Sequence, residues 1–208
     1  MSSFKTLDDL GDITGKVALV RVDLNLPMKD GSATDVSRVE AVKPTILELA
    51  EKGAKVLLLA HYGRPKGQRF STMSTSFVQG DVEKVLDKEI MFIPEVMGPV
   101  VEQSIGILGD GDIGLLDNVR FWPGEEANDP EFARGMAAHG DFYVNDAFSA
   151  AHRAHASTEG LAHHLPAYAG RAMEAELKAL DAALGNPEAP VAAVVGGAKV
   201  STKLDVLT

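Results

Sequence analysis

The stretch VALVRVDLN, residues 17–25, is an apolar run with the polar residues Asp23 and Asn25 directly behind it. The run is apolar throughout and does not alternate, which is typical of a strand covered on both faces. Further runs along the chain share this character and are separated by segments with helical patterns. The other predicted strands are KVLLLA (55–60), MFI (91–93), IGLLDN (113–118), DFYVN (141–145) and VAAVV (191–195).

The helix predicted after the first strand has clear signals at both ends. Ser37-Arg38-Val39-Glu40 has the pattern of a capping box, in which the serine and the glutamate each satisfy a free amide of the first turn. Gly53 provides a left-handed stop. Pro44 lies inside the segment and predicts either a kink or a later start of the helix.

Two more helices are predicted further along the chain. Asp129 followed by Pro130 is typical of a helix start, and Gly140 is expected to end that helix. Residues 171–184 place apolar side chains at helical spacing and predict a long amphipathic helix. Residues 66–80 are polar and poorly patterned, so we expect a mobile loop there.

This alternation of strands and helices predicts an α/β fold. We expect a three-layer αβα domain with a mainly parallel, doubly wound, Rossmann-like sheet, followed by a connecting helix and a truncated second domain. In such sheets the ligand site lies outside the carboxyl ends of the strands.

The composition excludes several classes of protein. The 208 residues carry a formal net charge of -10, which argues against a surface for nucleic acid or anionic membranes. The chain has no cysteine, so disulfides and thiolate chemistry are absent. No apolar run reaches the ~18 residues of a membrane span, and the N-terminus lacks the apolar core of a signal peptide. We expect a cytoplasmic protein.

Polar and basic side chains follow several of the predicted strands. If the strands are parallel, these side chains meet at one edge of the sheet, where guanidinium groups offer forked donors to phosphate or carboxylate. The predicted site residues are Asp23, Asn25, Arg38, His61, Arg64, Arg120 and Arg153, the last five forming a cationic cluster. A single arginine after a strand is usually only a surface residue, but five on one edge favour an anion site.

The stretch NDAFSAAHRAHAS, residues 145–157, places Arg153 among small residues that allow a ligand to approach closely. Its histidines, His152 and His155, have a spacing that is compatible with metal binding. Neither has a cysteine or a helix-borne carboxylate nearby, so we predict no metal site in this chain.

Near the end of the chain, VVGGAKVSTK (194–203) is a strand that leads into paired glycines and a lysine-bearing helix start. Backbone amides at such a turn can cradle an anion, and Lys199 and Lys203 share one helical face. The same turn is common in α/β proteins without any ligand, so by itself it leaves both interpretations open.

Five motifs along the chain are distinctive as a set: RVDLNLP (21–27), AHYGRP (60–65), LLDNVRF with PGEE (115–126), YVNDAFSAAHRAHAS (143–157) and GGAKVSTKL (196–204). Taken together, they resemble the phosphoglycerate kinase family over nearly the whole chain. The resemblance implies reversible phosphoryl transfer between 1,3-bisphosphoglycerate and ADP, giving 3-phosphoglycerate and ATP in glycolysis. The nucleotide would act with Mg2+, and the metal and most nucleotide contacts are expected from a missing C-terminal half.

The resemblance also implies a role for each matched residue. Asp23 and Asn25 would contact the hydroxyl and carboxylate end of 3-phosphoglycerate, and the five basic residues would surround its phosphate and carboxyl groups. Arg38 and Lys199 are the expected catalytic residues, because both would stabilise the transferring phosphoryl group. The expected nucleotide-binding residues are Gly196, Gly197, Lys199 and Lys203.

By the same resemblance, residues 1–170 form the substrate domain, 171–186 the connecting helix and 187–208 the incomplete start of the nucleotide domain. We expect a monomer that binds 3-phosphoglycerate weakly and turns over negligibly alone. The alternative is a non-catalytic domain that binds a phosphorylated carboxylic acid. A nicotinamide-linked dehydrogenase is disfavoured, because Asp23-Leu24-Asn25 stands where a glycine-rich fingerprint would follow the first strand.

Overall fold

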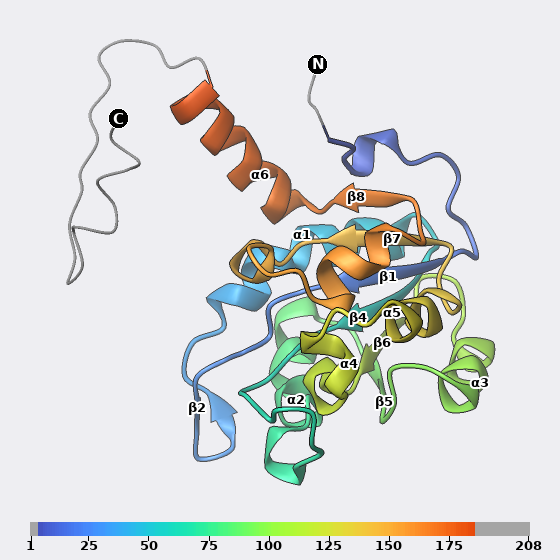
Figure 1. Ribbon diagram of the computed structural model, residues 1–208, viewed down its shortest axis with the longest axis vertical. Coiled ribbons are helices and arrows are strands. Elements are labelled where there is room, and N and C mark those ends of the chain that lie inside the picture. The colour runs from blue at the N-terminus through green and yellow to red at the C-terminus, as the bar shows by residue number, and fades with distance from the viewer. Residues whose placement is uncertain (1–3, 186–208) are drawn as a thin grey trace. The chain divides into compact units, whose positions relative to one another are not determined.

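The computed structural model describes residues 4–185, in which a parallel sheet is flanked by helices (Figure 1). The strands of this sheet are β1 (Val17–Arg21), β4 (Lys55–Leu59), β5 (Ile90–Ile93), β6 (Ile113–Leu116), β7 (Phe142–Asn145) and β8 (Ala167–Ala169). The α-helices are α1 (Ser37–Glu51), α2 (Ser76–Leu86), α3 (Pro99–Ile107), α4 (Pro123–Glu126), α5 (Pro130–Ala137) and α6 (Arg171–Leu180). Short helical turns are η1 (Leu7–Asp9), η2 (Ser71–Met73), η3 (Val119–Phe121), η4 (Phe148–Ala150), η5 (Ala156–Gly160) and η6 (Asp181–Gly185).

The strand order is β5-β6-β4-β1-β7-β8, and every neighbouring pair is parallel. Figure 1 shows this order from β8 at the top of the sheet to β5 at the bottom. The chain leaves β1 toward β4 on one side and later adds β7 on the other side. The predicted α/β fold with a parallel, doubly wound sheet is confirmed.

Apolar residues cover both faces of the sheet, as the unbroken hydrophobic runs require. Ala18 and Val20 of β1 pack in the cluster that contains the buried sides of α1 and α2. Val17 and Leu19 point to the opposite cluster, which contains residues of α3, α5 and η5. The central strands are therefore inaccessible from either face, and their carboxyl ends are left to form a site.

The start of α1 differs from the prediction. Ser37 is already the first helical residue, and no side chain caps the helix at Val36. The carboxylate of Asp35 instead accepts a hydrogen bond from the Ser37 N–H at 2.8 Å, so the predicted capping box is wrong. Pro44 lies inside the helix without moving its start. The predicted stop at Gly53 is confirmed by a left-handed φ of 81°.

The start of α5 agrees with the prediction. Asp129 Oδ1 accepts a hydrogen bond from the Phe132 N–H at 2.9 Å, and Pro130 is the first helical residue. At the other end, the Gly140 N–H bonds the Ala137 carbonyl. A Cβ atom on Gly140 would lie 2.6 Å from Leu19 Cγ, so this glycine also lets the chain pass close to the core.

Residues 66–80 are not a loop throughout, so this part of the prediction is wrong, whereas the predicted mobility stays a prediction. They contain η2 and the first turns of α2, whose buried side chains include Val78 and Val82. The carboxylate of Asp117 holds this segment by accepting hydrogen bonds from the Ser74 hydroxyl at 2.9 Å and the Thr75 N–H at 3.0 Å. A buried carboxylate at the end of β6 therefore fixes residues 74 and 75, directly before α2.

Three short strands were not predicted. β8 has only three residues, and β2 (Met28–Lys29) and β3 (Ser32–Ala33) form a small antiparallel hairpin. The predicted strand VAAVV (191–195) lies outside the described residues.

The described residues divide into two units between residues 176 and 177, and the whole sheet belongs to the first. The helix predicted from residue 171 begins there. The predicted domain limits at residues 170 and 186 stay predictions. Within the described part of the chain, no helix combines the length and apolar character needed to cross a membrane.

Candidate functional site

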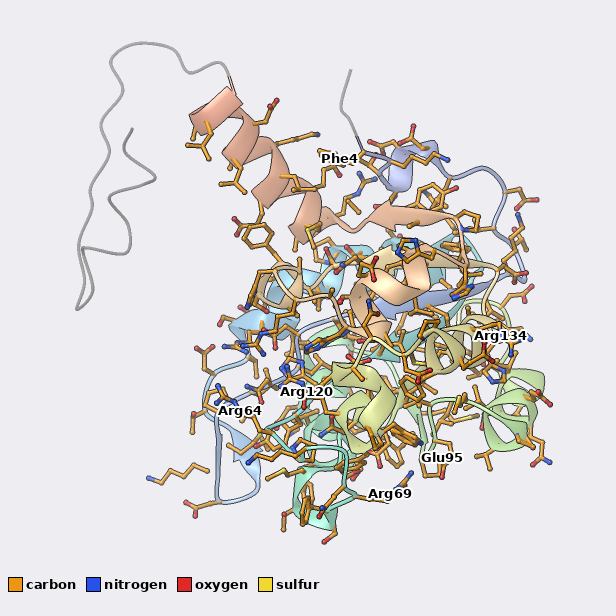
Figure 2. All side chains as sticks on the ribbon, in the orientation of Figure 1. Phe4, Arg64, Arg69, Glu95, Arg120 and Arg134 are labelled. Carbon is orange, nitrogen blue, oxygen red and sulfur yellow. The ribbon has the colours of Figure 1, made fainter. Side chains whose placement is uncertain are left out.

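A cavity of about 230 Å3 lies at the carboxyl ends of β1, β4, β6 and β7. Its lining residues are Asp23, Asn25, Arg38, His61, Gly63, Arg64, Arg120, Ser149, Ala150, His152 and Arg153. All seven predicted substrate-binding residues are in this set, so the structure brings them together at one edge of the sheet. Figure 2 shows Arg64 and Arg120 at this edge, well apart from Arg134 on α5.

The topology explains why the cavity forms here. β1 lies between β4 and β7, and the loops that follow these strands diverge where the strand order reverses. A crevice opens at such a switch point in doubly wound sheets. Asn25 closes one side of it, because its Oδ1 accepts a hydrogen bond from the Gly63 N–H at 2.9 Å and joins the loops after β1 and β4.

Asp23 and Arg38 form an ion pair at the rim of the cavity. Arg38 Nη1 lies 2.9 Å from Asp23 Oδ2, and the Ser149 hydroxyl donates to the same oxygen at 2.6 Å. Burial alone would raise the pKa of Asp23. Hydrogen bonds from Ser149 and from the Asn25 N–H, with the charge of Arg38, outweigh burial and lower this pKa below its usual value. Asp23 is therefore an ionised acceptor that orients Arg38.

Arg120 lies deep in the cavity wall and is only partly satisfied. Only 4% of it is exposed, and its Nη1 donates to the Gly63 carbonyl at 3.1 Å. Its Nε lies 3.5 Å from Glu126 Oε1 and has no hydrogen bond among the described residues. Burial lowers the pKa of Arg120; Glu126 opposes this effect and the nearby Arg21 reinforces it. Because Arg120 lines the cavity, its guanidinium group is placed to attract an incoming anion.

Arg64 and Arg153 complete the basic lining. Neither side chain has a hydrogen bond or ion pair within residues 4–185, and both belong to loops, one after β4 and one after η4. Their guanidinium groups are available to a ligand. Together with Arg120, they give the cavity a positive field although the chain as a whole is acidic.

His61 lines the cavity without carrying a charge. Burial, followed by the charges of Arg21 and Arg120, lowers the pKa of His61 to about 3. Its Nδ1 lies 2.9 Å from Arg21 Nη2. The sequence counts His61 among the cations, and this part of the prediction is wrong, because the ring is neutral at physiological pH.

The family model described as "Phosphoglycerate kinase" matches residues 7–208. The chain belongs to the phosphoglycerate kinase family. Phosphoglycerate kinases from Sphingopyxis alaskensis and Rhizobium johnstonii are 66% and 63% identical to it over 207 residues each, which is 100% of this chain and 52% of each relative.

Solved structures agree with this assignment. The phosphoglycerate kinase of Coxiella burnetii superposes with a TM-score of 0.87 at 38% identity, covering 98% of this chain and 51% of that one. The enzyme from Pyrococcus horikoshii gives 0.85 at 33% identity with the same coverage. The chain thus spans about half the length of the phosphoglycerate kinases that it matches.

The structure does not test the nucleotide-binding residues predicted from the phosphoglycerate kinase resemblance. Gly196, Gly197, Lys199 and Lys203 lie outside the described residues. Within residues 4–185, no group of three or more histidine, aspartate or glutamate side chains is arranged to hold a metal ion. The prediction of a chain without a metal site stays a prediction.

Arg21 is a functional candidate that is absent from the predicted set. It is 1% exposed, and its Nε donates to Ser157 Oγ at 2.9 Å while its Nη1 donates to the Val22 carbonyl. The available signal was a charged residue at the end of an otherwise apolar strand, which needs a partner inside the fold. Ser149 and Gly63 also line the cavity, but nothing comparable in the sequence marks them as site residues.

Proposed function

We propose that this chain is the part of a phosphoglycerate kinase that binds 3-phosphoglycerate. One observation carries the proposal: a small cavity is lined by Arg38, Arg64, Arg120 and Arg153, and the side chains of Arg64 and Arg153 have no hydrogen bond or ion pair among the described residues. A phosphate and a carboxylate on a three-carbon acid would meet these guanidinium groups in bidentate contacts. Asp23 and Asn25 would bind the hydroxyl and carboxylate end.

In the proposed reaction, the substrate carboxylate oxygen forms a bond to the γ-phosphorus of ATP, and the bond from this phosphorus to the bridging oxygen of ADP breaks. The reverse step makes ATP from 1,3-bisphosphoglycerate. An ionised carboxylate needs no general base, so positioning and charge neutralisation supply the catalysis. The half-exposed Arg38 at the rim is suited to the transferring phosphoryl group.

The remaining parts of this proposal concern the whole enzyme. Residues 1–170 would form the substrate domain, 171–186 the connecting helix and 187–208 the start of the nucleotide domain. Lys199 would stabilise the transferring group, while Gly196, Gly197 and Lys203 would hold the nucleotide, which acts with Mg2+. The enzyme would be a cytoplasmic monomer.

Calorimetric titration of the 208-residue chain with 3-phosphoglycerate tests the proposal. We expect saturable binding, weaker binding of glycerate, which lacks the phosphate, and loss of roughly tenfold in affinity for Arg64→Ala. Arg134→Ala is the matched control, because this arginine pairs with Glu131 on the surface of α5 and does not line the cavity. Failure of 3-phosphoglycerate to bind would overturn the proposal.

The alternative of a non-catalytic binding domain is tested separately. A coupled assay with a chain of the length of the curated relatives should show ATP formation from 1,3-bisphosphoglycerate and ADP. Arg38→Ala in that chain should lower kcat far more than it raises KM. Binding without turnover would favour the binding domain, and equal effects on kcat and KM would make Arg38 a simple binding residue.

A further inference from the structure

A line of hydrogen-bonded side chains runs behind the cavity from Glu125 to His61. Glu125 Oε2 accepts from the Ser157 N–H at 2.9 Å, and Glu125 Oε1 accepts from the Ser157 hydroxyl at 2.6 Å. Arg21 Nε donates to this hydroxyl oxygen at 2.9 Å, and Arg21 Nη2 lies 2.9 Å from His61 Nδ1. Of these four residues, only His61 lines the cavity.

The direction of every hydrogen bond in this line follows from its chemistry. A guanidinium group can only donate, so the Ser157 hydroxyl oxygen accepts from Arg21. The one hydroxyl proton of Ser157 is then used in the hydrogen bond that Ser157 donates to Glu125. For the same reason, His61 Nδ1 accepts from Arg21. A neutral imidazole with an accepting Nδ1 carries its proton on Nε2.

Burial makes this arrangement costly to rearrange. Glu125 and Ser157 are 0% exposed and Arg21 is 1% exposed. Turning Arg21 away from His61 would leave a buried guanidinium donor without an acceptor. The two opposite charges, Arg21 and Glu125, are joined through one serine, and neither reaches the cavity.

We propose that Glu125, Ser157 and Arg21 are positioning residues that hold His61 as the Nε2–H tautomer, so that the ring offers a neutral donor to an anion in the cavity. The use of this donor for 3-phosphoglycerate rests on the function proposed above, whereas the fixed tautomer does not. The site would then combine charged guanidinium donors with one neutral N–H whose direction is fixed before the ligand arrives.

NMR of the ligand-free 208-residue chain tests the fixed tautomer directly. In a spectrum that correlates ring protons with both ring nitrogens, His61 should show an unprotonated Nδ1 and a protonated Nε2 at neutral pH. In the double variant Arg21→Met with Glu125→Gln, which removes both buried charges together, we expect a mixture of tautomers. A charged His61 or an Nδ1–H tautomer in the unmodified chain would overturn the proposal, and so would an unchanged tautomer in the variant.

Two further variants separate an effect on the His61 tautomer from a general loss of structure. Tyr143→Phe is the matched control, because it removes a buried hydrogen bond from the Tyr143 hydroxyl to the Ser157 carbonyl at 3.0 Å but leaves the line intact. Its tautomer should be unchanged. If the double variant fails to fold, Ser157→Ala takes its place, since it releases Arg21 Nε without removing a charge. A tautomer that stays fixed in Ser157→Ala would contradict the role of the line.

Binding measurements then separate this inference from the proposed function. The double variant should bind 3-phosphoglycerate about tenfold more weakly than the unmodified chain, because one well-directed donor to an anion is lost. If the tautomer responds as expected but 3-phosphoglycerate does not bind even to the unmodified chain, the proposed function fails and the positioning role stands. Unchanged affinity in the variant, with a changed tautomer, would overturn the proposed use of His61 as a donor.

Discussion

At the scale of single residues, His61 and Arg120 show how burial sets the chemistry of the cavity. Both have a lowered pKa, with burial as the largest cause in each case. The histidine responds by staying neutral. The arginine remains a cation in the cavity wall, with its Nε buried 3.5 Å from Glu126 Oε1.

The lowered pKa of His61 makes the stability of the protein depend on pH. The unfolded chain takes up a proton near the usual pKa of 6.5, whereas the folded chain does so only at about 3. Between these values the unfolded state binds more protons, so stability falls as the pH falls. Burial also lowers the pKa of His139 and His155, which act in the same direction.

We therefore expect His61 to account for ~2 kcal/mol of the stability lost between pH 7 and pH 5. Urea unfolding at the two pH values measures this difference. In His61→Gln the amide oxygen can still accept from Arg21, and the difference should shrink by about that amount. An equal loss of stability in the variant and the unmodified chain would contradict the role of His61.

Arg120→Met separates binding from folding. We expect the affinity for 3-phosphoglycerate to fall roughly 100-fold, because a charged donor in the cavity wall is lost. Stability should change by less than about 1 kcal/mol, since the folded state already disfavours this buried charge. Calorimetric titration and thermal unfolding measure the two effects. A loss of about 3–5 kcal/mol, as when a buried ion pair is broken, would instead show a structural role.

At the scale of elements, the sequence predicted the long strands and missed the features that depend on tertiary contacts. The hydrophobic runs of β1 and β4 are unambiguous because both faces are buried. β8 has only three residues, and it is held by pairing with β7 rather than by its own pattern. α2 was missed although its buried residues Val78, Val82 and Leu86 lie at helical spacing. The segment before it is fixed by Asp117, a contact that no local pattern reveals.

The candidate site was predictable for a related reason. Residues that follow parallel strands share one edge, so seven lining residues could be named from their positions alone. Arg21 could not be assigned in the same way, because it is the last residue of β1 rather than a residue after the strand, and its partners Ser157 and His61 are distant in sequence. The charge of His61 also depends on burial that the sequence does not display.

Two glycines allow a matched test of element packing. Gly80 is exposed on α2, and a Cβ atom there would have no atom of residues 4–185 within 4 Å. Gly80→Ala should stabilise the protein by about 0.5–1 kcal/mol through helix propensity. Gly140→Ala should cost about 1–3 kcal/mol, because its Cβ would lie 2.6 Å from Leu19 Cγ. Urea unfolding measures both values, and the same sign for both would contradict this account.

At the scale of the whole molecule, the distribution of charge has a testable consequence. The chain has a net charge of -10, yet Asp23 is the one acidic residue among the described residues that line the cavity. If the local arginines govern binding, added salt should weaken the affinity for 3-phosphoglycerate several-fold. If the net charge governed binding, salt would strengthen it by screening repulsion.

Titrations at ionic strengths of roughly 0.01 and 0.15 M distinguish these outcomes, because the screening length falls from ~30 to ~8 Å between them. Glycerate is a suitable comparison ligand, since it carries less charge and should respond less to salt. Affinity that rises with salt would show that the arginines do not dominate the field at the cavity.

The residues that line the cavity lie between positions 23 and 153, in loops and helical turns that follow four different strands. No single one of these segments forms the cavity. The cavity is complete only when β1, β4, β6 and β7 are paired in the sheet. A compact folding intermediate with native helices but loose packing would lack the affinity of the native chain. Recovery of ligand binding during refolding therefore reports the completion of sheet assembly, which a measurement of helix content alone would miss.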